Sequence, residues 1–154
     1  MILPVVREKQ RLDSVFSLAG QMSLDEEILS HWAKYLCVLT SGFIENALRL
    51  ILYDYVTNHA NETVSSYMSA RLEGLTNLND QRIAQLLGSF NPTWRDTFLE
   101  IRSAEQKDAI DSVVANRHLI AHGRSVGLTL ARMKGYYLEI LKAIKIIDEN
   151  CVKR

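Results

Sequence analysis

The chain has few of the residues that interrupt helices. Only two prolines and seven glycines occur in its 154 residues. Apolar residues recur at three- and four-residue spacing almost throughout, which leaves little room for strands. The sequence therefore predicts an all-α fold. With 47% hydrophobic residues, residues 1–154 have enough apolar content for a single domain around one core, a bundle of about five to seven helices.

The chain also has only two cysteines and no net charge. Cys37 and Cys151 each lie in an apolar helical pattern, so we expect two buried, reduced thiols rather than a disulfide framework or a zinc site. The formal net charge is zero, which excludes binding to polyanions by bulk charge. Any contact with nucleic acid must then come from a local basic patch.

Long uncharged hydrophobic runs are also missing. The apolar N-terminus, Met1–Val6, soon meets charged residues and lacks the core of a signal peptide. The most apolar stretch, Leu48–Val56, is too short to span a bilayer and contains Arg49 and Asp54. We therefore expect a cytoplasmic protein without a membrane-spanning segment.

Capping residues divide the chain into helices. The predicted segments are Pro4–Met22, a long helix from a capping box at Ser23–Glu26 to about His59, Glu62–Arg71 capped by Asn61, Asn79–Gly88, Pro92–Ile101 capped by Asn91, a helix from a capping box at Ser103 and Gln106 to Gly123, and Leu128–Cys151. The long second helix should bury one stripe, made of Leu29, Trp32, Leu36, Leu39, Phe43, Ala47, Leu50 and Ile51. Gly42 inside it lowers helix stability unless another helix packs closely there.

One segment carries no acidic residue. Between Ser112 and Leu138 there is no Asp or Glu, whereas Arg117, Arg124, Arg132 and Lys134 all occur there. This asymmetry predicts an anion site, with Arg124, Arg132 and Lys134 as candidate RNA contacts.

The run Asn116–Gly123 ends a helix with two histidines, one arginine and a glycine cap. An arginine can hold a phosphate in bidentate fashion, and a histidine can move a proton near neutral pH. Arg117 and His122 therefore supply what cleavage of a phosphodiester needs without a metal. The alternative is structural: a cationic histidine is favoured near a helix C-terminus, and Arg117 could be solvated or cap the core.

Other candidate sites are weaker. His118 and His122 have the spacing of zinc ligands, but no cysteine or acidic residue lies nearby in sequence, so we expect no metal. Glu45 either pairs with Arg49 within its helix or lies near Arg117 or His122. Asn79–Ile101 could form a helix-turn-helix, although Asp96 and Glu100 in its second helix disfavour contact with DNA.

Two segments resemble the HEPN superfamily, in particular the RiboL-PSP-type group of ribonucleases. Arg117 and His122 fit the R-x(4–6)-H motif of that superfamily, with His118 in the position after the arginine. Ser41-Gly42-Phe43-Ile44-Glu45 is similar to the small-residue and acidic segment of its long second helix. Relatives paired with nucleotidyltransferase antitoxins often carry a tyrosine two residues after the motif histidine, where this chain has Arg124.

The resemblance implies a HEPN-like helical bundle and a metal-independent, homodimeric endoribonuclease with no cofactor. Arg117 and His122 would be catalytic, with Asn116, His118 and Glu45 in supporting positions. A toxin or phage-defence role, with an antitoxin or another protein partner, is what the family suggests. The alternatives are a catalytically silent adaptor that binds a partner protein or nucleotide, and a purely structural bundle.

Helix geometry adds a reason to expect two copies. Arg117 and His122 are five residues apart, which places them roughly 140° apart around a regular helix. One chain's pair therefore converges poorly on a single phosphate. A twofold axis beside this helix would bring two arginines and two histidines into one cleft, providing both an acid and a base.

Overall fold

The computed structural model describes residues 1–23 and 25–153, and this part of the chain contains helices and no strand. The α-helices are α1 (Leu3–Gln21), α2 (Glu26–His59), α3 (Glu62–Glu73), α4 (Asp80–Phe90), α5 (Pro92–Ile101), α6 (Ala104–Ala121) and α7 (Leu130–Ile146), followed by a π-helical turn, η1 (Ile147–Cys151). The predicted all-α class is confirmed.

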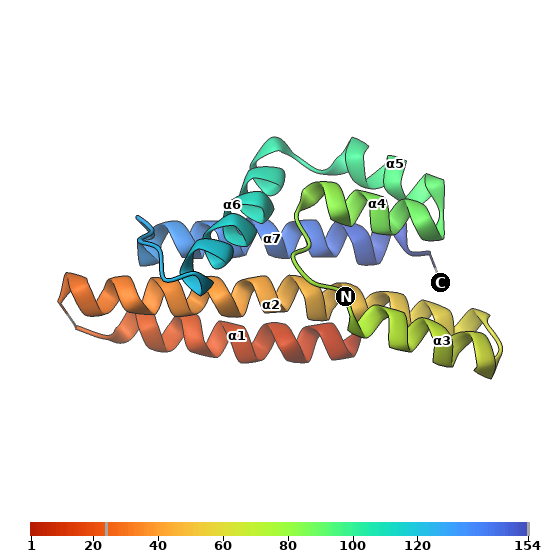
Figure 1. The fold of residues 1–154 in the computed structure, drawn as a ribbon, viewed down its shortest axis with the longest axis horizontal. Helices are drawn as coiled ribbons and strands as arrows, with labels where there is room; N and C mark the ends of the chain where they lie inside the picture. The colour runs from red at the N-terminus through yellow and green to blue at the C-terminus, as the bar shows by residue number, and fades with distance from the viewer. Residues whose placement is uncertain (24, 154) are drawn as a thin grey trace.

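The long helix α2 organises the bundle. In Figure 1, α1 runs beside it on one side, α6 and α7 lie on the other, and α3 folds back along its C-terminal end. Only part of the predicted stripe of α2 is fully buried: Leu36, Phe43, Ala47 and Ile51 are buried, whereas Leu29, Trp32, Leu39 and Leu50 are partly buried. The helix buries other positions as well, because neighbours cover it on several sides.

Among the described residues, α2 is the one helix long and apolar enough to cross a membrane by length and composition. Of its most apolar stretch, 56% is buried inside the bundle. That burial is the pattern of a core helix.

Most of the predicted helix starts are confirmed by their caps. The side chains of Asn61, Asn79 and Asn91 accept hydrogen bonds from the first turns of α3, α4 and α5. Ser103 and Gln106 form the reciprocal capping box at the start of α6. The other predicted box, Ser23–Glu26, is wrong. Asp25 caps α2 instead, and its carboxylate accepts the amide of Ile28 at 2.9 Å.

Three helix bounds also differ from the prediction by two residues. The segment predicted to end at Arg71 continues to Glu73. The segment predicted to end near Gly88 continues to Phe90, and the last helix begins at Leu130, after the cap residue Thr129, rather than at Leu128. Leu128 is buried before the helix starts, so its apolar character reflects packing of the preceding loop. The C-terminal turn to Cys151 is π-helical.

Helices α4 and α5 pack as a pair, and arginines in and directly after α5 contact carboxylates. Arg102 lies next to the buried carboxylate of Asp80, with Nε 2.6 Å from Oδ1, and its Nη2 donates to Oδ2 at 2.9 Å. The Nε contact is poorly aligned, so attraction of opposite charges dominates it. Arg95 pairs with Asp96. These contacts disfavour the helix-turn-helix alternative, because a DNA-reading helix needs free basic side chains.

Both cysteines are buried and free, as predicted. Burial raises the pKa of each thiol to about 11, so both remain protonated at neutral pH. The thiol of Cys37 lies 3.4 Å from the carbonyl oxygen of Val113, which links α2 to α6.

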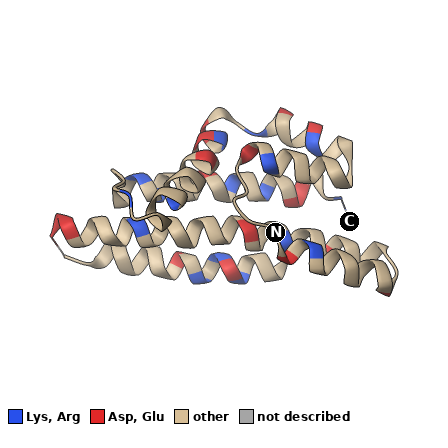
Figure 2. Ribbon diagram, in the orientation of Figure 1, with Lys and Arg blue, Asp and Glu red and all other residues tan. Residues whose placement is uncertain are grey.

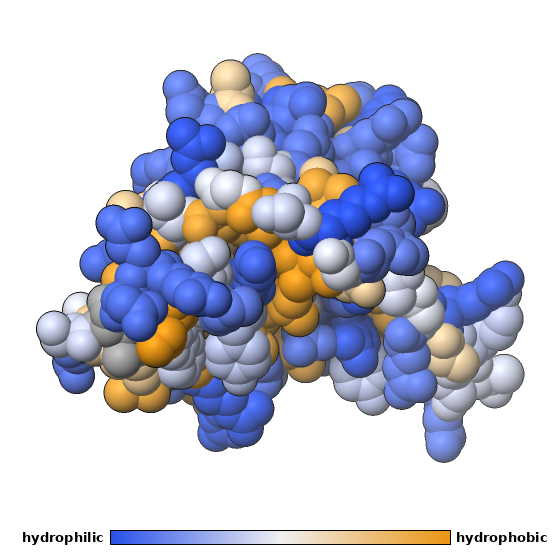
Figure 3. All heavy atoms as spheres, turned by 60° about the vertical axis from the view of Figure 1, so that its left-hand side comes forward, coloured by the Kyte–Doolittle hydropathy of each residue, from blue (hydrophilic) through white to orange (hydrophobic). Residues whose placement is uncertain are grey.

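The surface is not uniformly polar. In Figure 3, hydrophilic atoms cover most of the face shown, but apolar atoms are exposed across its middle. Exposed large hydrophobic side chains on α2 are Ile28, Tyr35, Val38 and Tyr53. Contiguous exposed apolar surface often marks an interaction site.

Candidate active site

The end of α6 is a sharp and well-capped helix terminus. Gly123 adopts a left-handed backbone with φ of 67°. Its amide donates to the carbonyl of Ile120 at 3.0 Å, and the amide of Arg124 donates to the carbonyl of Leu119 at 2.9 Å. This pattern is a Schellman motif, which favours glycine because a Cβ is strained at positive φ. The motif fixes where α6 stops and where His122 emerges.

Arg117 leaves α6 on the side that faces the bundle. It lies one turn after Val113, which is fully buried, so both share one face of the helix. The guanidinium is partly buried, and its Nη1 donates to the side-chain oxygen of Asn77 at 2.8 Å. The alternative of a wholly solvated arginine is therefore excluded in this structure.

Asn77 in turn is held by Glu45. Its backbone amide donates to Oε1 of Glu45 on α2 at 2.8 Å. Asn77 has a φ of 53°, and among the described residues it is the only one other than glycine with a positive φ. Asparagine tolerates this conformation better than most residues do. Two hydrogen bonds through Asn77 thus link Glu45 to Arg117 across three segments. We call this set of three residues the relay.

Neighbouring contacts hold the turn that carries Asn77. The amide of Asp80, three residues later, donates to Oδ1 of Asp111 on α6 at 2.9 Å. The same Asp80 carboxylate lies against Arg102. Burial raises the pKa of Asp80, and the Arg102 guanidinium offsets part of that rise. The turn between α3 and α4 is therefore tied to α2, α5 and α6.

The histidines lie in a different environment. His118 and His122 are both exposed, and their rings meet edge to face with centroids 4.5 Å apart. The described residues contain no group of three or more His, Cys, Asp or Glu side chains arranged to hold a metal ion. Because both residues are exposed, a bound molecule can reach their side chains.

The predicted supporting residues Asn116 and Glu45 differ in whether their side chains contact the site. Asn116 donates to the carbonyl of Ser112 in its own helix at 2.8 Å, so its amide is used locally. Glu45 reaches the site through Asn77. Its predicted alternative, an ion pair with Arg49, is absent from the described residues, and Arg49 donates to Asn46 instead.

The basic residues of the acid-free segment lie in different surroundings. Arg124 is exposed, and only its backbone caps α6. Arg132 lines a groove with Glu105, Asp108 and Glu139, while Lys134 lines a groove with Asp13 between α1 and α7. Figure 2 shows acidic and basic positions interspersed along the bundle. The grooves that Arg132 and Lys134 line therefore also contain carboxylates from other helices.

Sequence reasoning missed Asn77. It lies between the segments predicted as helices, Glu62–Arg71 and Asn79–Gly88, where the sequence predicted no site residue. Its role depends on contacts with residues 32 and 40 positions away. The one local signal is its residue type, since asparagine is frequent at left-handed turn positions.

A family model described as RiboL-PSP-HEPN matches residues 6–153. The chain belongs to this family. The match covers both the relay and the histidine pair, so the resemblance drawn from Arg117, His122 and the Gly42 segment is confirmed. Membership indicates a nuclease-like or nucleotide-related function for this HEPN domain. No curated protein and no solved structure matches the chain.

Proposed function

We propose that this HEPN domain is a metal-independent endoribonuclease whose active site combines Arg117 and His122 from two copies of the chain. One observation carries the proposal. The relay holds the Arg117 guanidinium at 2.8 Å from Asn77, while an exposed histidine pair stands at the capped end of the same helix. A positioned cation and a free proton carrier are the two groups that phosphodiester cleavage requires.

The proposed reaction is an internal transesterification. A histidine accepts the proton of the RNA 2′-hydroxyl as its oxygen attacks the adjacent phosphorus. The bond from phosphorus to the 5′-oxygen breaks, and a second histidine donates a proton to that leaving oxygen. The products are a 2′,3′-cyclic phosphate and a 5′-hydroxyl, and DNA is spared because it has no 2′-hydroxyl.

Arg117 acts on the phosphate in this proposal. Its guanidinium stabilises charge on the non-bridging oxygens as the fifth bond to phosphorus forms. Asn77 uses one of the five guanidinium N–H groups, which leaves the others for the substrate. Asn77 and Glu45 are positioning residues, since they act through Arg117.

Two copies are needed because the groups of one chain diverge. Arg117 lies on the face of α6 turned to the bundle, while His122 is exposed at its end. In a homodimer, His122 of one copy serves as the base and His122 of the other as the acid. His118 orients its neighbour, His122, through the edge-to-face ring contact.

The other basic residues bind RNA in this proposal. Arg124 contacts the RNA backbone, and Arg132 and Lys134, in separate grooves, contact RNA only away from the cleaved bond.

The test is RNA cleavage by purified protein in the presence of EDTA, with the same sequence as DNA for comparison. We expect the wild-type protein to cleave the RNA and not the DNA. Neither Arg117→Ala nor His122→Ala should cleave the RNA. Loss of activity in EDTA, restored by a divalent metal, would contradict the metal-independent mechanism. Binding of a protein or nucleotide without cleavage under any condition would support the adaptor alternative instead.

We further propose that the enzyme acts in the cytoplasm as a toxin or phage-defence effector, restrained by an antitoxin or another protein partner. Induced expression of the wild-type chain should then arrest bacterial growth. The His122→Ala variant, expressed at the same level, should not. Equal growth of the two cultures would contradict the toxin role. The cleavage mechanism is tested separately by the assay in EDTA.

A further inference from the structure

One face of α2 beside the candidate site is exposed or only partly buried. Tyr35, Val38, Gly42, Asn46 and Arg49 recur at three- and four-residue spacing and form this face, which we call the Gly42 face. Tyr35 is 51% exposed and Val38 40% exposed. Large apolar side chains on the exposed side of a core helix are expected where another protein surface covers them.

Gly42 is the centre of this face. A Cβ built on it would meet nothing within 4 Å. Glycine lowers the stability of a helix interior, and here no neighbour in the chain requires its small size. The gap that glycine leaves allows another helix backbone to approach closely.

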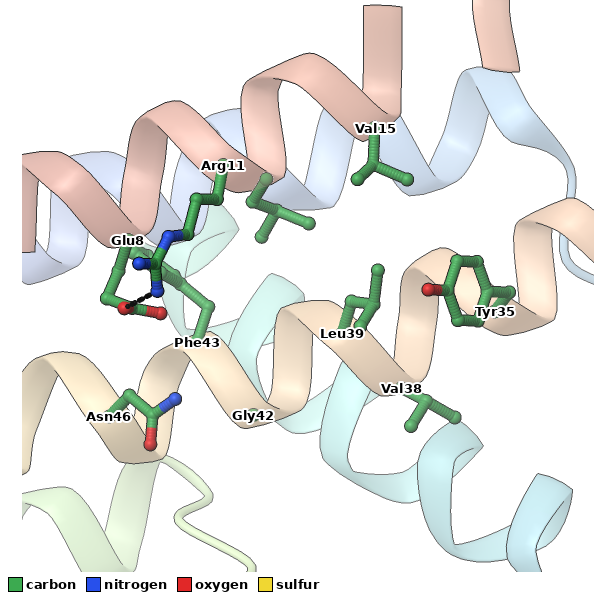
Figure 4. Close-up of a pocket in the computed structure, with 10 residues that line it drawn as sticks. Glu8, Arg11, Val15, Tyr35, Val38, Leu39, Gly42, Phe43 and Asn46 are labelled. Carbon is green, nitrogen blue, oxygen red and sulfur yellow. Dashed lines mark hydrogen bonds and ion pairs between the residues drawn. The ribbon is translucent and has the colours of Figure 1, made fainter. Parts of the chain in front are cut away.

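A shallow groove adjoins the Gly42 face. It lies between α1 and α2, has a volume of about 340 Å³, and is lined by apolar side chains that include Val15, Leu39 and Phe43. Figure 4 shows these side chains around the gap between the two helices, with Gly42 on the same stretch of α2. At one end, Arg11 pairs with Glu8, so the rim carries both signs of charge.

The other edge of the face adjoins the relay. Glu45 follows Gly42 by less than one helical turn and accepts the amide of Asn77. Asn77 accepts the guanidinium of Arg117. A partner on the Gly42 face would therefore lie next to Arg117.

We propose that a second copy of this chain docks on the Gly42 face, with the two α2 helices antiparallel and a twofold axis beside Gly42. This inference rests on the proposed function, because the site needs groups from two copies. Gly42 lies at the middle of α2, Glu26–His59, so the helix offers equal lengths on both sides of the axis.

The face is complementary to itself in this arrangement. Residues equally spaced before and after Gly42 lie opposite each other across a twofold axis between antiparallel helices. Tyr35 then faces Arg49 of the second copy, an aromatic ring against a guanidinium. Val38 faces Asn46, and no like charges face each other among these pairs.

The arrangement also brings the two relays together. Glu45 of one copy and Glu45 of the other are about 9 Å apart along the paired helices, at 1.5 Å per residue. Each holds an Asn77 and, through it, an Arg117. Both arginines therefore flank one cleft across the axis, which is the composite site that the divergent single-chain geometry requires.

The first test is a disulfide across the axis in the full chain carrying Gly42→Cys. We expect a covalent dimer under mild oxidation, because closely packed helices at a glycine bring the two Cα atoms within the range of a disulfide. Gly135→Cys on α7 is the matched control, since a Cβ there also meets nothing within 4 Å. Cys37 and Cys151 are buried and stay silent. Equal crosslinking of both variants, or none at Gly42, would overturn the proposal.

The second test is a charge exchange across the predicted pair. Arg49→Glu should place a carboxylate opposite Tyr35 and weaken dimerisation at least tenfold in a dilution series followed by light scattering. Tyr35→Arg combined with Arg49→Glu should restore the dimer, because each new arginine faces a new glutamate. If the double variant remains as weak as the single one, the register is wrong.

The nuclease proposal and the interface proposal can be contradicted independently. A crosslinked dimer that does not cleave RNA keeps the interface and contradicts the nuclease. A wild-type enzyme that cleaves RNA as a dimer, without the Gly42→Cys crosslink, keeps the nuclease and contradicts this interface. A wild-type chain that stays monomeric and binds another protein through the Gly42 face would show that a different partner covers it, which also contradicts the inference.

Discussion

The two halves of the candidate site, both on α6, differ in how they are built. Arg117 is fixed by tertiary contacts, through Asn77 to Glu45 on another helix. His118 and His122 contact each other and otherwise face solvent. The proposed phosphate-binding half is thus held by contacts within the chain, whereas the proposed proton-transfer half is exposed. Variants of the two halves should therefore behave differently in stability as well as in activity.

The largest effect should come from the exposed half. His122→Ala removes the proposed proton carrier, and RNA cleavage should fall by about 100- to 10,000-fold. Because the side chain is exposed, the free energy of unfolding should change by less than about 0.5 kcal/mol. Single-turnover cleavage and thermal melting of the same preparation give both values. If His118→Ala abolishes cleavage and His122→Ala does not, the roles of the two histidines are reversed.

The half that contains Arg117 should respond in both measurements. Arg117→Ala removes the proposed phosphate contact, with an expected loss of about 100- to 1,000-fold in turnover. It also leaves the side-chain oxygen of Asn77 without its donor, which lowers the free energy of unfolding by about 1 kcal/mol. Urea denaturation of wild type and variant measures this difference. A variant as stable as the wild type would show that the contact with Asn77 contributes nothing to folding.

A smaller effect is expected when the support of Arg117 is removed. Asn77→Gly keeps the positive φ and the backbone amide for Glu45 but deletes the acceptor of Arg117. We expect turnover to fall roughly tenfold, the equivalent of 1.4 kcal/mol of lost positioning.

Asn77→Asp is the matched control for that variant. It retains an oxygen for Arg117 and tolerates the same backbone, so activity should return toward the wild-type level. A purely structural role for Asn77 would change melting temperature and leave turnover unaffected in both variants.

The smallest effect concerns the surface around the histidines. Arg124→Ala should weaken RNA binding and reduce its salt slope by about 0.7 for a single strand, because one phosphate contact is lost. Melting temperature should not change, since the backbone of Arg124, not its side chain, caps α6. Arg95→Ala on α5 is the control: Arg95 pairs with Asp96 and has no part in the proposed RNA site, so its loss should leave the slope unchanged. Equal slopes for the two variants would remove Arg124 from the RNA site.

The fold could be predicted largely because its signals are local. Asparagine caps, the Ser103 and Gln106 box and the glycine at the end of α6 each act within a few residues, and all were confirmed. The failure at Ser23 has a local cause too, since Asp25 competes for the same helix start with a charged acceptor. The buried stripe of α2 was underestimated because periodicity gives one face and not the number of neighbours.

The site was predictable only in part, for a similar reason. Arg117 and His122 are visible in one short segment, but the orientation of Arg117 depends on Asn77, which no sequence spacing connects to it. The basic patch was inferred from a segment without acids, yet Glu105 and Asp108, from another helix, line the same groove as Arg132. A surface is assembled from several segments, so the charge of one segment does not determine it.

The most direct test of the central claim is the chemistry of the cleaved ends. A short RNA should be incubated with the purified wild-type protein in EDTA, and the fragments analysed by mass spectrometry alongside His122→Ala. The account predicts a 2′,3′-cyclic phosphate on one fragment and a 5′-hydroxyl on the other, with intact RNA in the variant. Fragments with a 5′-phosphate and a free 3′-hydroxyl, or cleavage that persists in His122→Ala, would contradict it.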